Sequence, residues 1–295
     1  MSDFRLKVFQ SVAKNLSFTK ASQELFVSQP AITKHIQELE ATYQTKLFDR
    51  QGSKISLTES GRLLLEHCER ILEEYKRLEY EMHLLHNEYI GELKLGASTT
   101  IAQYVLPPLL GSFIGKFPQV NLSLLNGNSR EIEAALQEHR IDLGLVEGVF
   151  RLPNLKYTTF LEDELVAVVH SKSRLQLPEE ITPQDLPAIP LVLRERGSGT
   201  LDVIERSLQK HGVKLSSLHV LMYLGSTESI KLFLENSDCM GIVSIRSICK
   251  ELAAGTFRVV EIKDMPMLRD FCFVQLQGQE GGLSQAFMNY MFMSR

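Results

Sequence analysis

Hydrogen-bonding side chains recur at helical spacing directly after Ser28. Gln29, Thr33 and Gln37 lie four residues apart, so a helix would present them on one face. Lys34 lies beside Thr33 and adds a positive charge to that face. Amide and hydroxyl groups can hydrogen-bond base edges, whereas a lysine binds mainly to phosphate. These side chains are suited to the major groove of double-stranded DNA and predict a nucleic-acid interface.

The residues between these polar groups predict the helix that carries them. Ser28 suits the N-cap, and Pro30 in the first turn has no backbone N–H to leave unpaired. Ile32, Ile36 and Leu39 follow one another at helical spacing and form a single apolar face. That face is expected to pack against two earlier helices, which leaves the polar face outward.

Segments on both sides complete a predicted helix-turn-helix with a wing. Before the helix, Thr19 can cap a shorter helix and Phe26 can fill the turn. After it, residues 51–57 predict a tight two-stranded wing, on which Arg50 and Lys54 can contact phosphate. An ordinary three-helix bundle is the alternative for the helices alone, and the wing favours DNA binding. The residues predicted to contact DNA are Ser28, Gln29, Pro30, Thr33, Lys34, Gln37, Arg50 and Lys54.

A long amphipathic segment follows the wing. From Thr58 to about Glu88 there is no proline, and the only glycine is Gly61. Apolar residues there repeat alternately four and three residues apart, which is typical of helices that associate through a seam. About 31 residues at about 1.5 Å each form a rod of about 46 Å, too long to bury its stripe on a small domain. Packing on the C-terminal region is the alternative to self-association. The predicted dimerisation residues are Leu64, Ile71, Tyr75, Leu78, Met82 and Leu85, with Cys68 and Tyr89 in the same stripe.

Beyond Gly91 the pattern changes to short apolar runs that alternate with amphipathic segments. This alternation predicts an α/β fold with mainly parallel sheets, and about 205 residues fit two small lobes better than one. The predicted strands are 92–96, 120–125, 142–146, 164–169, 189–193, 219–224, 241–245 and 271–276. The predicted helices are 104–117, 130–139, 201–211, 228–235 and 284–292.

Small polar residues recur directly after predicted strands, where helices begin. Free N–H groups, hydroxyls and the positive helix end at such corners can bind a small anion or carboxylate. Ligands of α/β folds bind at the carboxyl ends of strands. Simple N-capping explains any one cluster, but four clusters can converge on one cleft. The predicted effector-binding residues are Ser98, Thr99, Thr100, Asn128, Ser129, Gly197, Ser198, Gly199, Thr200, Ser226 and Thr227.

Composition and motifs argue against several other functions. The net charge of −4 provides no general basic field. The four cysteines form no Cys-x-x-Cys motif, so neither zinc nor a disulfide framework is indicated. The sequence has no phosphate loop, His-Glu-x-x-His motif or dinucleotide fingerprint, and Arg196 stands where a nucleophile elbow around Ser198 would need glycine. We therefore expect no cofactor and no catalysis.

Two other functions fit parts of the chain. A free-standing solute-binding protein fits residues 91–295 alone, but the sequence has neither an export signal nor a membrane-length apolar run. A cytoplasmic protein is therefore expected. A redox trigger would use Cys239 and Cys249, which lie ten residues apart and could pair on oxidation. Ordinary buried thiols are the alternative for this pair.

Several motifs lie in register with those of a known family. They are Ala21, Leu25, Ser28-Gln-Pro-Ala31, Ile36, Leu39-Glu40, Leu47-Phe-Asp-Arg50, Thr58-Glu-Ser-Gly61, Leu106-Pro107 and Ile141-Asp-Leu-Gly-Leu145. Through them the sequence resembles the LysR-type transcriptional regulators from end to end. Residues 193–200 resemble the branch linked to sulfur and carbon assimilation. Residues 236–246 depart from the family, because no proline follows the strand.

The resemblance implies an organisation and a set of partners. It implies an all-α winged helix-turn-helix domain at 1–58, a dimerisation linker helix at 59–90, and an α/β effector domain at 91–295 shaped like a periplasmic binding protein. Lobe I would comprise 91–162 and 266–295, and lobe II 163–265. The implied partners are promoter DNA, further copies of the chain in a homodimer or homotetramer, and a small anionic effector. RNA polymerase is a further candidate, and no membrane is involved.

Overall fold

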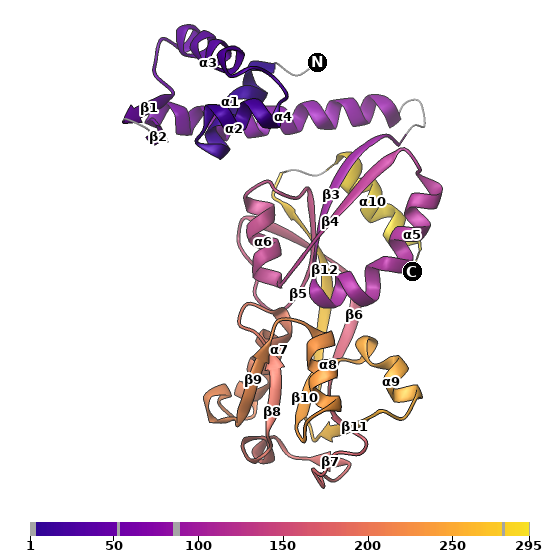
Figure 1. The fold of residues 1–295 in the computed structure, drawn as a ribbon. Helices are drawn as coiled ribbons and strands as arrows, with labels where there is room; N and C mark the ends of the chain where they lie inside the picture. Colours follow the sequence, from indigo (N-terminus) through magenta and orange to yellow (C-terminus); the bar gives the residue numbers. More distant parts are fainter. Residues whose placement is uncertain (1–3, 52–53, 85–88, 279–280, 295) are drawn as a thin grey trace. The chain divides into compact units, whose positions relative to one another are not determined.

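The computed structural model describes residues 4–51, 54–84, 89–278 and 281–294. They form two compact units, Met1–Glu88 and Tyr89–Arg295, each with its own hydrophobic core (Figure 1). None of the described helices is long and apolar enough to cross a membrane.

The first unit is the predicted winged helix-turn-helix followed by a long helix. Its core contains the fully buried Phe9, Ile32 and Leu47. The hairpin after the third helix is antiparallel, with Phe48 opposite Leu57. The elements are α1 (Phe4–Asn15), α2 (Phe18–Glu24), α3 (Gln29–Tyr43), β1 (Phe48–Gln51), β2 (Lys54–Leu57) and α4 (Glu59–Leu84).

The N-cap residue predicted from the sequence is correct for α3 but not for α2. The Ser28 side chain accepts a hydrogen bond from the Ala31 N–H, so the predicted cap of α3 is confirmed. The prediction of Thr19 as the cap of α2 is wrong. Ser17 takes that role, accepting from the Lys20 N–H, because α2 already begins at Phe18.

The first part of α4 packs into the core of the first unit. Near its start, a Cβ at Gly61 would lie 2.1 Å from the Leu47 carbonyl oxygen, so glycine is required for this close approach. About two turns further on, Cys68 is fully buried in the core of the first unit. The interpretation of Cys68 and Tyr89 as seam residues is therefore wrong: Tyr89 belongs to the second unit, where its ring lies 4.5 Å from that of Phe117.

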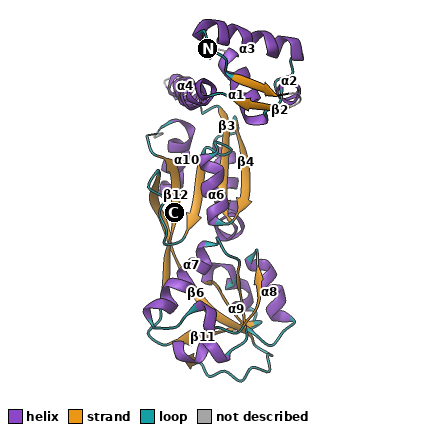
Figure 2. Ribbon diagram, turned by 90° about the vertical axis from the view of Figure 1, so that its left-hand side faces the viewer, coloured by secondary structure: helices purple, strands orange, loops and turns teal. Residues whose placement is uncertain are grey.

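The second unit consists of two lobes joined by two long strands (Figure 2). Lobe I contains β3 (Gly91–Ser98), a π-helical turn (Ile101–Val105), α5 (Leu106–Lys116), β4 (Val120–Gly127), α6 (Ser129–Gln137), β5 (Leu143–Glu147) and α10 (Gly282–Met293). Lobe II contains β7 (Glu180–Ile181), β8 (Leu191–Arg194), α7 (Gly199–Lys210), β9 (Val220–Leu224), α8 (Thr227–Glu235), β10 (Met240–Ser244), α9 (Cys249–Ala253) and β11 (Phe257–Ile262), with short 3₁₀ turns at 183–188, 215–217 and 245–247.

The joining strands are β6 (Leu155–His170) and β12 (Met267–Leu276), which pair along their length (Figure 1). Each is longer than its predicted strand. Pairing is parallel among β3, β4 and β5 and among β8, β9 and β10, but β6 and β12 pair antiparallel to all their neighbours. The prediction of mainly parallel sheets therefore holds within each lobe but not for the strands that join them.

The two lobes have separate cores, and the joining strands contribute to both. Phe160 and Phe271 pack in lobe I, whereas Leu165 and Met267 pack in lobe II. Between these pairs the strands carry charged residues in place of apolar ones, namely Glu162-Asp163-Glu164 and Arg269-Asp270. The change from one core to the other occurs at this charged segment.

Candidate DNA-binding surface and interlobe cleft

The polar face of α3 is exposed as a continuous surface. Ser28, Gln29, Pro30, Lys34 and Gln37 are exposed, whereas the Ile32, Ile36 and Leu39 side chains on the opposite face are at most 3% exposed. Thr33 is half-buried, and its hydroxyl accepts a hydrogen bond from the Gln29 side chain at 3.1 Å. An N-terminal helical turn with these groups can approach base edges without disturbing the core.

The wing and the turn complete this surface. Arg50 and Lys54 lie on β1 and β2, but their side chains lie outside the described part of the chain. Phe26 does not fill the turn as predicted, because it is 95% exposed. Its φ of +54° directs the side chain outward, and backbone hydrogen bonds such as Val27 N–H to the Ser22 carbonyl close the turn instead.

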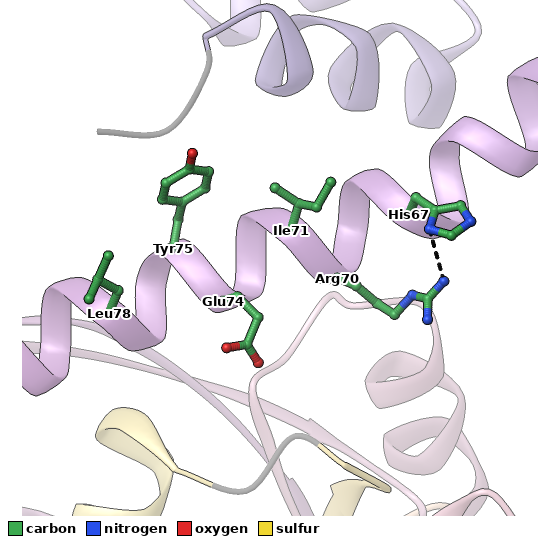
Figure 3. A pocket seen from close by; sticks show the side chains of 6 residues that line it. All are labelled: His67, Arg70, Ile71, Glu74, Tyr75 and Leu78. Carbon is green, nitrogen blue, oxygen red and sulfur yellow. Dashed lines mark hydrogen bonds between the residues drawn. The ribbon is translucent and has the colours of Figure 1, made fainter.

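A groove runs along the exposed part of α4. It has a volume of about 510 Å³ and is lined by His67, Arg70, Ile71, Glu74, Tyr75 and Leu78 (Figure 3). Ile71, Tyr75 and Leu78 extend from the same side of the helix, and Glu74 extends from the other (Figure 3). The exposed fractions of Ile71, Leu78 and Met82 are 42–52%, a large apolar exposure for one helix face. Leu64, by contrast, packs at the edge of the core of the first unit, and Leu85 lies outside the described residues.

Three of the predicted effector-binding residues, Ser98, Ser129 and Gly199, meet around Glu147, at the end of β5. The Ser98 hydroxyl donates to the Glu147 carboxylate, and the Ser129 hydroxyl donates to the Glu147 carbonyl at 2.8 Å. A Cβ at Gly199 would lie 1.9 Å from the same carbonyl, so lobe II approaches lobe I here at backbone distance. The strand ends therefore converge as predicted, although several of their polar groups are used within the protein.

Three of the predicted residues act as helix caps. Asn128 forms a reciprocal capping box with Glu131 at the start of α6. Ser198 and Ser226 accept backbone N–H groups at the starts of α7 and α8. Gly197 has a φ of +92°, a conformation that favours glycine, and a Cβ there would lie 3.3 Å from the Asn128 side-chain oxygen.

A buried ionic cluster, which sequence reasoning missed, lies beside these residues. The Arg269 side chain is fully buried and pairs with Asp163 at 2.8 Å and Glu147 at 3.4 Å. Its Nη1 also donates to the Thr200 hydroxyl at 2.8 Å, and the Ser244 hydroxyl donates to Asp163 at 2.7 Å. Arg269 thus joins lobe I, a joining strand and lobe II. The only sequence signal was a charged pair, Arg269-Asp270, directly before the apolar run 271–274.

Arg194 is a second buried cation that the sequence analysis missed. Only 1% exposed, it lies at the carboxyl end of β8 and pairs with Glu195 through Nε at 2.8 Å and Nη2 at 3.0 Å. Its Nη2 also reaches the Thr99 hydroxyl of lobe I at 3.4 Å. Among the described residues, neither Arg194 Nη1 nor the buried Thr100 hydroxyl has a hydrogen-bond partner. Buried polar groups are normally satisfied, so these two can accommodate an acceptor oxygen.

An interlobe cleft opens next to Arg194. It has a volume of about 270 Å³ and contains three of the predicted residues, Thr99, Asn128 and Ser226, with Glu195 beside them. The other lining residues are Gln103, Asn126, Gly127, Glu131 and Gly225. The remaining predicted residues, namely Ser98, Thr100, Ser129, Gly197, Ser198, Gly199, Thr200 and Thr227, are buried and do not line this opening.

A further contact joins the lobes at this cleft. The hydroxyl of Tyr104 in lobe I donates to Glu228 in lobe II, and burial raises the pKa of Tyr104 well above its usual value. Glu228 also accepts from Lys231, which is 7% exposed and pairs with Glu251 at 2.6 Å. These contacts stabilise one relative arrangement of the lobes.

The cysteines provide little support for a redox trigger. Cys239 is buried, its thiol lies 3.2 Å from the Ser237 hydroxyl, and Cys249 is exposed; both are free. Burial raises the pKa of the Cys239 thiol, which reduces the thiolate fraction that oxidants attack. In the part of the chain that the structure describes, no group of His, Cys, Asp and Glu is arranged to hold a metal ion.

Comparison with known proteins identifies related sequences over the whole chain. Residues 4–62 match the family described as bacterial regulatory helix-turn-helix protein, lysR family, and residues 86–292 match the LysR substrate binding domain. The chain is 29% identical to the HTH-type transcriptional regulator CysL of Bacillus subtilis, covering 91% of this chain and 89% of that protein. It is 30% identical to a RuBisCO operon transcriptional regulator of Acidithiobacillus ferrooxidans, covering 98% and 92%.

Solved structures show the same architecture. The CcmR regulatory domain of Synechocystis PCC6803, in complex with 2-PG, is 28% identical with a TM-score of 0.62, covering 69% of this chain and 97% of that one. The LysR family transcriptional regulator CbnR has a TM-score of 0.60 at 22% identity, covering 100% and 99%. The fold class expected from the sequence is thereby confirmed.

Proposed function

Because this chain belongs to the LysR family of bacterial helix-turn-helix regulators, we propose that α3 reads promoter DNA while the interlobe cleft binds the effector that controls it. The protein is a DNA-binding transcriptional regulator and not an enzyme. The observation that carries the DNA-binding role is the exposed polar face of α3 opposite its buried apolar face. By this function the protein works in the cytoplasm, where promoter DNA lies.

The side chains on the DNA surface divide between two roles. Gln29, Thr33 and Gln37 contact base edges, because amides and hydroxyls can discriminate between bases. Lys34, with Arg50 and Lys54 on the wing, contacts phosphate and positions the helix. Ser28 and Pro30 begin α3 and present its first turn to the groove.

Lys34→Ala and Gln29→Ala should therefore change DNA binding in two different ways. Loss of Lys34 should weaken binding to all sequences and reduce the slope of log affinity against log salt by about 1, since one phosphate contact is removed. Loss of Gln29 should cost about 1–3 kcal/mol at particular base pairs and relax preference there. Fluorescence anisotropy on an operator and its single-base variants, at several salt concentrations, measures both.

An exposed lysine in the second unit provides the control for charge. Lys263→Ala removes the same charge from an exposed position and should leave DNA affinity unchanged. If neither Lys34→Ala nor Gln29→Ala alters affinity or preference, α3 is not the recognition helix.

The chain associates with itself through two surfaces in this proposal. The exposed stripe of α4, formed by Ile71, Tyr75, Leu78 and Met82, joins two copies into a dimer. The edge strands β4 and β9 carry exposed apolar residues, where edge strands usually carry charges. They join further copies into a tetramer through Leu124, Leu125, Leu221, Met222 and Tyr223, whose exposed fractions are 38–46%.

The effector in this proposal is a small anion or carboxylate in the interlobe cleft. Arg194 supports it, because its bonds to Glu195 and Thr99 hold it beside the cleft and its Nη1 has no hydrogen-bond partner among the described residues, so an acid oxygen would satisfy that N–H. The cleft itself supplies the neutral groups of Thr99, Asn128 and Ser226, and its two carboxylates, Glu131 and Glu195, already accept from the Asn128 N–H and from Arg194. Contacts between the lobes, such as Tyr104 to Glu228, stabilise one lobe arrangement, and an effector acts by binding this arrangement with a different affinity from others.

The deciding experiment measures binding of the full chain to genomic DNA fragments at physiological salt, including the region upstream of its own gene. A sharp shift that resists competitor DNA supports the proposal and supplies the operator. Weak binding that salt abolishes, both with and without small phosphate and carboxylate compounds, contradicts it. Binding that appears only with such a compound supports both parts of the proposal.

A further inference from the structure

A second cavity lies beside the joining strands. It has a volume of about 360 Å³ and shares no lining residue with the interlobe cleft. Its lining residues are Gly148, Val149, Arg151, Glu162, Arg206, Leu268, Arg269 and Asp270. We propose that this cavity is a second ligand site, which takes a small oxyanion, a phosphate or carboxylate group, through Arg151, Arg206 and Arg269.

Arg269 provides the buried part of the site. Its side chain is fully buried, and two of its three nitrogens are used within the protein, Nε by Asp163 and Nη1 by Thr200 and Glu147. The third nitrogen, Nη2, is buried and has no hydrogen-bond partner among the described residues. A guanidinium N–H without a partner is costly, and the cavity that Arg269 lines can hold the missing acceptor.

Two further arginines line this cavity, and neither forms an ion pair among the described residues. Arg206 is exposed on α7, and within the described ranges it forms no ion pair. Arg151, in the loop after β5, donates to the Cys272 sulfur at 3.3 Å and stacks on the Tyr157 ring at 4.4 Å, and in the same ranges it too has no ion pair. Planar guanidinium groups bind phosphate and carboxylate oxygens in pairs, so two such groups can hold one ligand.

The other lining groups limit the ligand further. Glu162 and Asp270 also line the cavity, and Arg269 is already paired with Asp163 and Glu147, so the lining offers a ligand guanidinium N–H groups and no excess of positive charge. Val149 and the 68% exposed Leu268 provide an apolar wall beside the cations. The cavity therefore fits a small oxyanion group on a short apolar body, held by guanidinium N–H groups, better than a large polyanion.

The three arginines belong to different parts of the second unit. Arg151 lies in lobe I, Arg206 in lobe II and Arg269 on β12, and α7 contacts both β5 and β12 (Figure 1). A ligand held by all three would bind preferentially to the lobe arrangement that brings them together. Such a ligand should therefore stabilise that arrangement and raise the unfolding temperature of the protein.

The test uses the full chain with inorganic phosphate, and in parallel with acetate, as probes. Isothermal titration calorimetry gives the affinity, and thermal unfolding reports stabilisation. Arg206→Ala and Arg151→Ala should each weaken phosphate binding about tenfold, as expected for loss of one charge-assisted contact. Lys210→Ala removes a charge one turn further along α7, outside the cavity lining, and should leave binding unchanged. Thr99→Val changes the interlobe cleft and should remove only phosphate bound there, so the binding that depends on Arg151 and Arg206 should persist in this variant.

Each outcome of these measurements supports or overturns the second ligand site. Binding of phosphate or acetate that both arginine variants weaken, and both controls retain, supports the second site. If neither probe binds the wild-type chain up to millimolar concentrations, the proposal is wrong. Binding that Thr99→Val abolishes and Arg206→Ala retains also overturns it, because the anion then occupies the interlobe cleft. That last result would leave the proposed effector site intact, so the two proposals fail separately.

Discussion

Arg269→Met should lower the free energy of unfolding by about 3–5 kcal/mol, the cost of leaving buried charges without their partner. Arg269 faces the buried Glu147 and Asp163, at 3.4 and 2.8 Å, and Asp163 has a more distant second cation, Arg246, at 3.7 Å. Methionine has similar length and no charge, so it fills the space but leaves the buried Glu147 without its cation and Asp163 with only the more distant Arg246. Urea unfolding of the full chain, followed by circular dichroism, measures the change.

Two further variants distinguish the loss of charge from a general disturbance of β12. Leu268→Ala changes the preceding residue, which is 68% exposed, and should alter stability by less than about 0.5 kcal/mol. Adding Asp163→Asn to Arg269→Met should recover part of the loss, since one unpaired charge is then removed. An Arg269→Met protein that unfolds at the wild-type urea concentration would show that the cluster does not stabilise the lobes.

The double variant Ile71→Asp/Leu78→Asp should convert the dimer to a monomer and weaken operator binding by about 100- to 10,000-fold. Both side chains lie on the exposed stripe of α4, at 42% and 51% exposure, so carboxylates there can be tolerated in the monomer. In a dimer they would be buried without partners. A monomer loses the advantage of binding two half-sites together, which accounts for the size of the effect. Analytical ultracentrifugation and gel-shift titration measure the two consequences.

Leu63→Asp is the matched control for this variant. Leu63 is 60% exposed on the same helix but lies outside the seven-residue repeat, so the variant should remain dimeric. Circular dichroism confirms that α4 is still helical in both proteins. If the double variant remains dimeric and binds the operator normally, the seam on α4 has been assigned to the wrong face.

The helix-turn-helix could be predicted because its determinants are local. The Ser28 cap, the Pro30 turn and the apolar face at Ile32, Ile36 and Leu39 act within a few residues of one another. Periodicity and capping express such short-range interactions directly in the sequence. For the same reason most strands and helices of the second unit could be assigned, whereas the extra length of β6 and β12, set by their pairing, could not.

The sequence also located the strand ends at which polar groups gather, but not how those groups are used. Ser98, Ser129 and Thr200 were predicted to face an effector, yet their hydroxyls bond to Glu147 and Arg269 within the protein. A serine at a helix start has the same sequence signature whether it binds a ligand, caps the helix or pairs with a buried charge. The choice depends on what the rest of the chain places opposite it.

What the sequence determined by itself was the DNA-binding module, the long helix and the alternation of strands and helices. Tertiary structure alone decided which charges are buried and what they meet. Arg194 contacts Thr99 from 95 residues away, and Arg269 contacts Asp163 from 106 residues away. In sequence a buried arginine is indistinguishable from one on the surface, because burial arises only when distant segments pack together. The unpaired nitrogens of these two arginines, and the cavities beside them, therefore became visible only in the folded chain.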